Sequence, residues 1–250
     1  MTEITAILTV WKRATLERQL AAIREQSLPP TAIRIYHCGD HIDPVAVLRT
    51  VDWARVDYVR CDIDFGFFGR FALATFATTA FVAVIDDDMI PGREWFAYAL
   101  DRHRHHRAVI AGQGFVLPRH CLDVRHVLQA ARDGRVDRDM AVDFGGCSWF
   151  FPTAWSQRLW TVPPVHLRNA EDMHFSAAMA QAGVPTVVPA QRTIERLASC
   201  APNIGGDDVA AWRRNGYAQE RNSTLAYLVA NGWRPLLGEP RADLPEGAER

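Results

Sequence analysis

Three consecutive aspartates, Asp86, Asp87 and Asp88, are the residues with the clearest capacity for chemistry, and they directly follow the apolar run 81–85. Carboxylates on adjacent residues repel one another, and a bound cation commonly offsets that repulsion. In an extended segment residues i and i+2 point the same way, so we expect Asp86 and Asp88 to converge while Asp87 faces elsewhere. Oxygen ligands of this kind suit Mg²⁺ or Mn²⁺. The triplet therefore predicts a divalent-metal site, and the alternative is an acidic turn that caps the next helix.

Glu171 and Asp172 form a second acidic group, at the start of a helical pattern. The helix dipole favours acids in the first turn, so capping is the plainer interpretation of this pair. Earlier in the chain, the segment 62–70 places glycines beside aromatic residues and ends at Arg70. Such a loop before a helix can lie over a phosphate or a base, with Arg70 supplying positive charge. A hinge loop with a surface arginine would have the same sequence.

Gly145 and Gly146 precede three bulky aromatic residues at 149–151. Glycines allow a ligand to approach the backbone, and aromatic rings stack on the apolar faces of sugars. We therefore expect Trp149 to contact a ligand, while ligand contact and ordinary core packing fit Phe150 and Phe151 equally well.

The elements that must position these residues alternate between strand and helix patterns in the first half of the chain. Strand patterns cover 4–10, 32–38, 56–61 and 81–85, and helical patterns lie around 16–23 and 70–79. This alternation predicts an α/β fold with a mostly parallel sheet and helices on both faces. Ligands bind at the carboxyl ends of strands in such sheets, which is where the aspartates lie.

The second half of the chain is less regular. Helical patterns cover 92–106, 122–132 and 171–183, and strand patterns cover 108–116, 140–144 and 184–188. We expect one main domain over 1–190 and a loop and helical extension over 191–237 that packs on it. The Pro-, Gly- and Glu-rich end, 238–250, predicts a disordered tail.

The composition favours some classes of function over others. The 250 residues carry a net charge of −1, so there is no electrostatic signal for nucleic acid. The five cysteines are widely spaced, which favours reduced thiols over a disulfide framework or a zinc site. No apolar run approaches the roughly 18 residues that span a bilayer. Because a strand pattern begins at once, we expect no signal peptide and a cytoplasmic location.

With these residues in order, the chain resembles a nucleotide-sugar-dependent glycosyltransferase of the GT-A fold over residues 3–190. The segment 9–13 is similar to the opening donor-binding turn of family 2-type enzymes, and Asp40 stands where a family acid contacts the base or ribose. The triplet 86–88 stands at the Asp-x-Asp motif, which holds the metal on the donor diphosphate. The pair 171–172 matches the Glu-Asp pair that opens an acceptor-side helix. The Gly-Gly-aromatic segment and the Asp-Asp-Asp form are also similar to exostosin-like transferases.

The resemblance implies a GT-A type nucleotide-binding α/β/α sandwich that moves a sugar from a nucleoside diphosphate sugar to an acceptor hydroxyl, with Mn²⁺ or Mg²⁺. It implies that Asp88 ligates the metal with help from Asp86. It also implies Asp172 as the general base of an inverting reaction, with Glu171 as the alternative. The donor-binding residues that it implies are Thr9, Trp11, Arg13, Asp40, Arg70 and Asp87, and the acceptor-binding residues are Gly145, Gly146 and Trp149.

The Gln-x-x-Arg-Trp motif of processive family 2 synthases is absent, so a non-processive enzyme is expected. Two functions other than glycosyl transfer remain open at this point. A nucleotidyltransferase also uses strand-end carboxylates and a metal, but the chain lacks a Gly-rich, basic triphosphate loop after its first strand. A non-catalytic sugar-binding protein is the third alternative, and the presence of two acid clusters argues against it.

Overall fold

The computed structural model describes residues 2–51, 56–119, 121–130, 136–191 and 206–236. Its strands are β1 (Ile4–Val10), β2 (Ala32–Cys38), β3 (Val56–Cys61), β4 (Phe81–Ile85), β5 (Val109–Val116), β6 (Leu128–Ala130), β7 (Met140–Val142), β8 (Phe144–Pro152) and β9 (Thr186–Val188). The α-helices are α1 (Leu16–Arg24), α2 (Pro44–Thr50), α3 (Phe68–Ala74), α4 (Trp95–His106), α5 (Glu171–Gln181) and α7 (Tyr217–Ala230). Short 3₁₀ helices are η1 (Val124–His126), η2 (Thr153–Trp160) and η3 (Ala211–Arg213).

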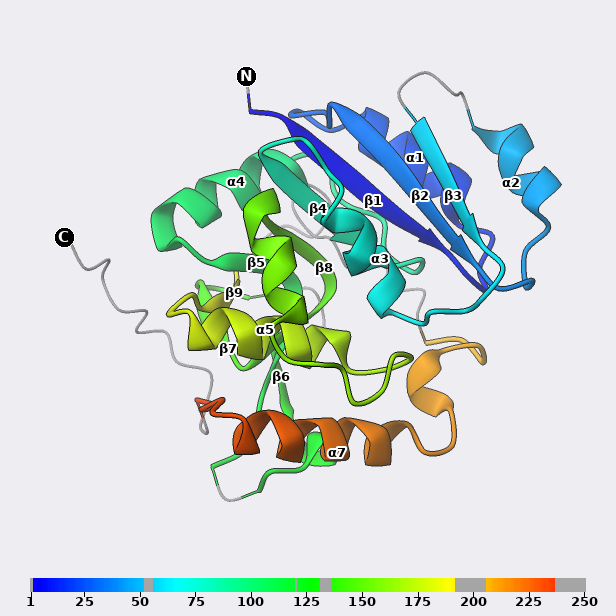
Figure 1. Cartoon of the computed structure of the whole chain (residues 1–250). Helices are drawn as coiled ribbons and strands as arrows, with labels where there is room; N and C mark the ends of the chain where they lie inside the picture. Colours follow the sequence, from blue (N-terminus) through cyan, green and yellow to red (C-terminus); the bar gives the residue numbers. More distant parts are fainter. Residues whose placement is uncertain (1, 52–55, 120, 131–135, 192–205, 237–250) are drawn as a thin grey trace.

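All nine strands belong to one mixed sheet with the order β3-β2-β1-β4-β8-β5-β9-β7, and β6 pairs with β5 (Figure 1). The four strands of the first half, β1 to β4, are all parallel to one another. Strand β8 runs antiparallel to both of its neighbours, β4 and β5. The predicted α/β sandwich is therefore confirmed in outline, with the parallel pairing concentrated in the first half of the chain.

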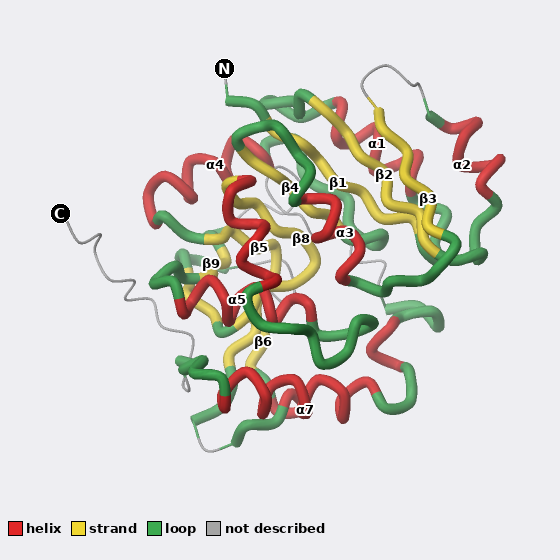
Figure 2. The backbone as a smooth tube through the Cα atoms, in the orientation of Figure 1, coloured by secondary structure: helices red, strands yellow, loops and turns green. Residues whose placement is uncertain are grey.

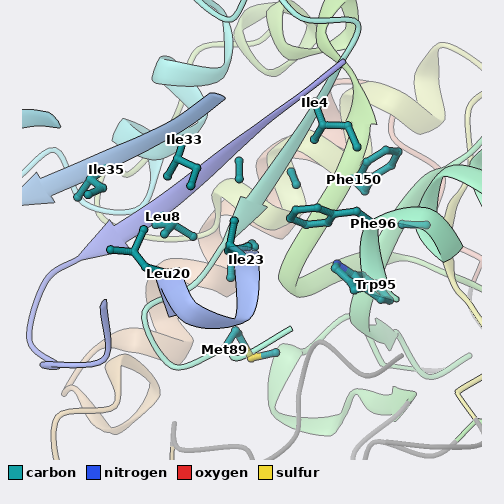
Figure 3. Packing of buried hydrophobic residues seen from close by; sticks show 14 of the residues in the cluster. Ile4, Leu8, Leu20, Ile23, Ile33, Ile35, Met89, Trp95, Phe96 and Phe150 are labelled. Atoms are coloured by element: carbon teal, nitrogen blue, oxygen red, sulfur yellow. The ribbon is translucent and has the colours of Figure 1, made fainter. Parts of the chain in front are cut away.

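Side chains that alternate along the strands divide the core between the two faces of the sheet. Ala6 and Leu8 of β1 pack with Leu20 and Ile23 of α1, while Ile7 between them packs with the helices of the other face. Figure 3 shows Leu8, Leu20 and Ile23 in the first of these clusters. The opposite face is covered by α3 and α5, which lie in front of the strands in Figure 2. This packing fixes where each strand ends, and the strand ends carry the candidate site.

Three elements differ from the sequence prediction. Strand β8 spans nine residues and is buried almost throughout, so its lack of apolar–polar alternation hid it from a period-2 reading. The predicted helix over 122–132 is wrong in its described part, which forms η1 and then β6. Helix α2 was not predicted from the sequence. Asp43 caps it by accepting a hydrogen bond from the Val45 amide (2.9 Å).

The described part of the C-terminal extension packs on the main domain. Leu225 and Leu228 of α7, with Trp233 after it, join Met173 and Ala177 of α5 in one apolar cluster. In the described residues no helix combines the length and apolar character needed to cross a membrane. The predicted tail, 238–250, lies outside the described residues.

Candidate active site

The carboxyl ends of the parallel strands β1, β2, β3 and β4 meet at one edge of the sheet, as the pairing of Leu8 with Ile85 and of Cys38 with Cys61 requires. Two adjoining cavities open along this edge, with volumes of about 530 Å³ and about 810 Å³. They share a wall formed by Trp11, Phe67, Arg70, Asp87, Ala210 and Ala211. The predicted strand-end location of the site therefore coincides with the cavities.

The aspartate triplet forms a tight turn instead of continuing β4. The Asp86 amide donates to the Cys147 carbonyl of β8 (3.0 Å), and the Met89 amide then donates back to the Asp86 carbonyl (3.2 Å). As a result all three aspartates line the larger cavity, and Asp87 lines the smaller one as well. The expectation that Asp87 faces elsewhere is wrong, because it assumed extended backbone through the triplet.

Two arginines hold the aspartates in place. Arg13 donates to Asp87 (2.8 Å) and lies 3.7 Å from Asp88. Arg70 is almost fully buried, ion-pairs with Asp86, and donates to Glu171 (2.6 Å). Its guanidinium also lies 5.1 Å from the centre of the Trp149 ring. Arg70 therefore links the aspartate turn after β4 to the first turn of α5.

Negative charge is in excess in this cluster. Four carboxylates, those of Asp86, Asp87, Asp88 and Glu171, form ion pairs with only two guanidinium groups, those of Arg13 and Arg70, within the described part of the chain. Burial raises the pKa of all four carboxyl groups, and of Asp86 most clearly, against the lowering effect of the arginines. Additional positive charge would therefore be electrostatically favourable in this cluster.

Unpartnered oxygen atoms show where such a charge fits. Asp87 Oδ2, Asp88 Oδ1 and Glu171 Oε2 are buried and accept no hydrogen bond from the described residues. Carboxylate oxygens of this kind are the ligands that Mg²⁺ and Mn²⁺ prefer. The aspartates do not by themselves form a compact three-ligand cage. Among the described residues, only Cys121, Asp123 and His126 bring three potential ligand atoms within 4.8 Å of one another.

The acids at the start of α5 differ in their surroundings. Arg221 of α7 donates to both carboxylate oxygens of Asp172, at 2.9 and 2.8 Å, and both side chains are buried. Glu171 pairs with Arg70 through Oε1 and leaves Oε2 without a partner. Both residues line the larger cavity, but only Glu171 has an oxygen available to a substrate.

The residues predicted to bind the donor are divided by the structure. Thr9 and Trp11 line the smaller cavity, and Arg13 lines the larger one. Asp40 lines neither: its side chain is 84% exposed and pairs with Arg60. The prediction for Asp40 is corrected, because the chain turns outward after β2 and His41 takes the place on the cavity wall.

The residues predicted to bind the acceptor lie within β8 and mainly serve its packing. Trp149 is 1% exposed and packs edge-on against Phe71, so it has no free face on which a sugar could stack. A Cβ at Gly145 would lie 2.6 Å from the Cβ of Ala111, so this glycine permits close strand packing. Gly146 does line the larger cavity. Trp149 lines the same cavity, so its contact with a ligand stays a prediction, while stacking of a sugar on its buried ring is not supported.

Sequence reasoning missed Arg221 and Asp207. Arg221 lies on the same helical stripe as Tyr217, Leu225 and Leu228, so its position among buried residues was a signal that its charge needed a partner. Asp207 accepts two hydrogen bonds from Arg13, at 2.8 and 2.6 Å, from a polar loop with no periodic pattern. That contact links the loop before η3 to the aspartate turn.

Comparison with known proteins does not indicate a function for this chain. No protein-family model matches the sequence, and no curated protein matches it. The assignment of function therefore depends on the chemistry of the two cavities.

His174 predicts that the stability of the protein falls at acid pH. It is 1% exposed, packs on Phe68 with ring centres 5.6 Å apart, and burial lowers its pKa to about 4. The folded state therefore favours the neutral imidazole, and stability is expected to fall as pH drops from about 6.5 towards 4. His174→Leu should remove roughly 3 kcal/mol of this acid-dependent loss. Urea unfolding at pH 7.5 and pH 4 measures it.

The exposed His105, on α4, provides the matched control for this experiment. His105→Leu should keep the wild-type difference in unfolding free energy between the two pH values. An unchanged difference in His174→Leu would show that His174 does not titrate in this range.

Proposed function

We propose that the protein is a metal-dependent, non-processive glycosyltransferase that moves a sugar from a nucleoside diphosphate sugar to an acceptor hydroxyl. The observation that carries this proposal is that the carboxylate cluster lines the larger cavity and reaches the wall shared with the smaller one through Asp87. A transfer reaction needs two substrate spaces that meet at the bond to be broken, and charge develops on the leaving group at that point.

The smaller cavity suits the nucleoside. Trp11 lies edge-on to both His41 and Phe67, with ring centres 5.8 and 6.1 Å apart, so aromatic side chains gather on its wall. Aromatic rings of this kind bind the flat face of a base. Lys12 and Arg70 also line this cavity and supply positive charge for the diphosphate. The donor sugar would then enter the larger cavity beside the aspartates.

The aspartate turn fits a divalent cation. Asp88 and Asp87 each offer an unpartnered, buried oxygen, and Asp86 completes the acidic wall. A bound Mn²⁺ or Mg²⁺ would supply Lewis-acid stabilisation of the leaving diphosphate. Since the aspartates alone form no three-ligand cage, the remaining ligands would come from the diphosphate oxygens and water.

We assign the general base to Glu171 in place of Asp172. Asp172 has both oxygens occupied by Arg221, whereas Glu171 Oε2 is unpartnered on the wall of the larger cavity. Burial raises the pKa of Glu171, which strengthens it as a base for the acceptor proton. In this scheme the acceptor oxygen loses its proton to Glu171 and displaces the diphosphate with inversion. Asp172 anchors α7 through Arg221.

Calorimetry with a panel of nucleoside diphosphates tests the proposal. We expect at least one of UDP, GDP, ADP, CDP and TDP to bind more tightly with Mn²⁺ than with EDTA. Asp88→Asn should remove at least about tenfold of that metal-dependent gain, since the loss of a ligand costs no less than the loss of its supporting residues.

Asp40→Asn is the matched control, because Asp40 is an exposed acid outside both cavities. It should keep the full effect of Mn²⁺. Binding that is the same with Mn²⁺ and EDTA in the wild type would contradict the metal assignment. Release of pyrophosphate from a nucleoside triphosphate would instead identify a nucleotidyltransferase.

A further inference from the structure

One wall of the larger cavity carries a group of side chains that the proposed chemistry does not use. Gln113 and Phe115 come from β5, Gln129 from β6, and Gly146 and Cys147 from β8. Strand β8 lies between β5 and β4, so it separates Gln113 and Phe115 from the strand that leads into the aspartates. Their arrangement shows what kind of molecule this wall would bind.

Gln113 presents a buried hydrogen-bond donor without an acceptor. It is 3% exposed, and its Oε1 accepts from Gln129 Nε2 (2.9 Å) and from Cys147 Sγ (3.2 Å). The amide is assigned in this orientation because its oxygen then accepts from both neighbours, the Gln129 amide and the Cys147 thiol. Gln113 Nε2 then finds no acceptor among the described residues. A buried donor without an acceptor destabilises the protein, and a ligand oxygen would relieve this.

Phe115 supplies an apolar surface beside that donor. Its half-buried ring stacks on the buried ring of Phe144, with centres 5.1 Å apart and planes inclined by 21°. A Cβ at Gly146 would lie 2.9 Å from Cε2 of Phe115, so the glycine is what allows the ring to lie against β8. Phe115 therefore supplies a half-buried aromatic ring on the wall of the cavity that the fully buried Trp149 also lines.

A buried amide N–H beside a backed aromatic ring matches the chemistry of a sugar ring. A pyranose offers hydroxyl oxygens as acceptors and an apolar C–H face that packs on an aromatic ring. A lipid alcohol would cover Phe115, but its single hydroxyl is the group that reacts, so no second oxygen is left for the amide of Gln113. We infer that the acceptor is itself a sugar, bound by Gln113 and Phe115, and this inference rests on the proposed transferase function.

Binding of simple glycosides tests the inference without turnover. The probes are the methyl α- and β-pyranosides of glucose, galactose and mannose, with n-octanol and a serine-containing tetrapeptide as the other acceptor classes. Saturation-transfer NMR is run with and without Mn²⁺ and the nucleoside diphosphates. At least one glycoside should bind the wild type in preference to the alcohol and the peptide. The affinity of the protein for this glycoside should fall by roughly tenfold in Gln113→Leu, the effect expected from the loss of one hydrogen bond between protein and ligand.

Two further variants keep the test interpretable. Phe115→Leu retains an apolar side chain but removes the flat ring, and it should weaken the same glycoside independently of Gln113. Gln157→Leu replaces an exposed glutamine of η2 and should leave glycoside binding unchanged. Circular dichroism and nucleoside diphosphate binding show whether each variant is folded.

The outcomes separate the two proposals. Glycoside binding that fails in the wild type, or persists unchanged in both Gln113→Leu and Phe115→Leu, would overturn the sugar acceptor. Selective binding of the alcohol or the peptide would overturn it as well. Absence of metal-dependent nucleoside diphosphate binding would instead overturn the transferase, whatever the glycosides do.

Discussion

Glu171→Gln is expected to lower the rate of sugar transfer by roughly 10²–10⁴-fold, the usual contribution of a general base. The glutamine oxygen can still accept from Arg70, so the side chain should stay in place. Metal-dependent binding of the nucleoside diphosphate should therefore change little. The rate is measured with the acceptor glycoside that binds best, and the anomeric configuration of the product is read by proton NMR.

Asp172→Asn is the comparison that assigns the base. With its carboxylate held by Arg221, Asp172 should affect transfer through stability and not through proton abstraction. Near-normal turnover in Glu171→Gln together with its loss in a folded Asp172→Asn would reverse the assignment. A product with retained configuration would remove the need for a base at either position.

The second large effect concerns stability: Arg221→Met should destabilise the protein by about 3–5 kcal/mol. Arg221 is buried with Asp172, and its guanidinium lies 5.2 Å from the centre of the Phe144 ring and 5.4 Å from that of Tyr217. Removal of the cation leaves a buried carboxylate without its partner. Urea unfolding gives the change in free energy.

Arg214→Met provides the control, from a residue that pairs with Glu220 close to the same helix. That pair is largely exposed, so its loss should cost no more than about 1 kcal/mol. The double variant Asp172→Asn/Arg221→Met should lose less free energy of unfolding than the sum of the losses in the two single variants. The reason is that neither change then leaves a buried charge without its partner. Additive losses, or a cost near that of Arg214→Met, would show that the buried pair is not coupled.

Local patterns predicted the elements that hold the aspartates, but not the contacts that finish the site. The four parallel strands have apolar runs bounded by turn residues, so their ends and the Asp86–Asp88 position could be read from the sequence. Trp149 could not be placed in the same way, because a strand buried on both faces has no alternation. A Gly-Gly-aromatic run is then equally typical of a ligand loop.

The ion pairs required the three-dimensional arrangement. Arg70 meets Glu171, and Arg221 meets Asp172, only after α3, α5 and α7 pack on the sheet. Residue type alone showed that each charge would need a partner, yet several acids were available to each arginine. Asp40 was misplaced for a similar reason, since the direction of the chain after β2 depends on a turn at Gly39 with φ of 72°.

Strand β8 sets a fixed interval between the two halves of the site. It lies between β4, which leads into the aspartates, and β5, which carries Gln113. Two interstrand steps amount to about 10 Å, and a hydrogen-bonded ladder does not stretch. In the proposed transferase, this interval would correspond to about the combined width of a donor sugar and one acceptor ring. Binding of substrates would therefore leave the distance between the two halves of the sheet unchanged.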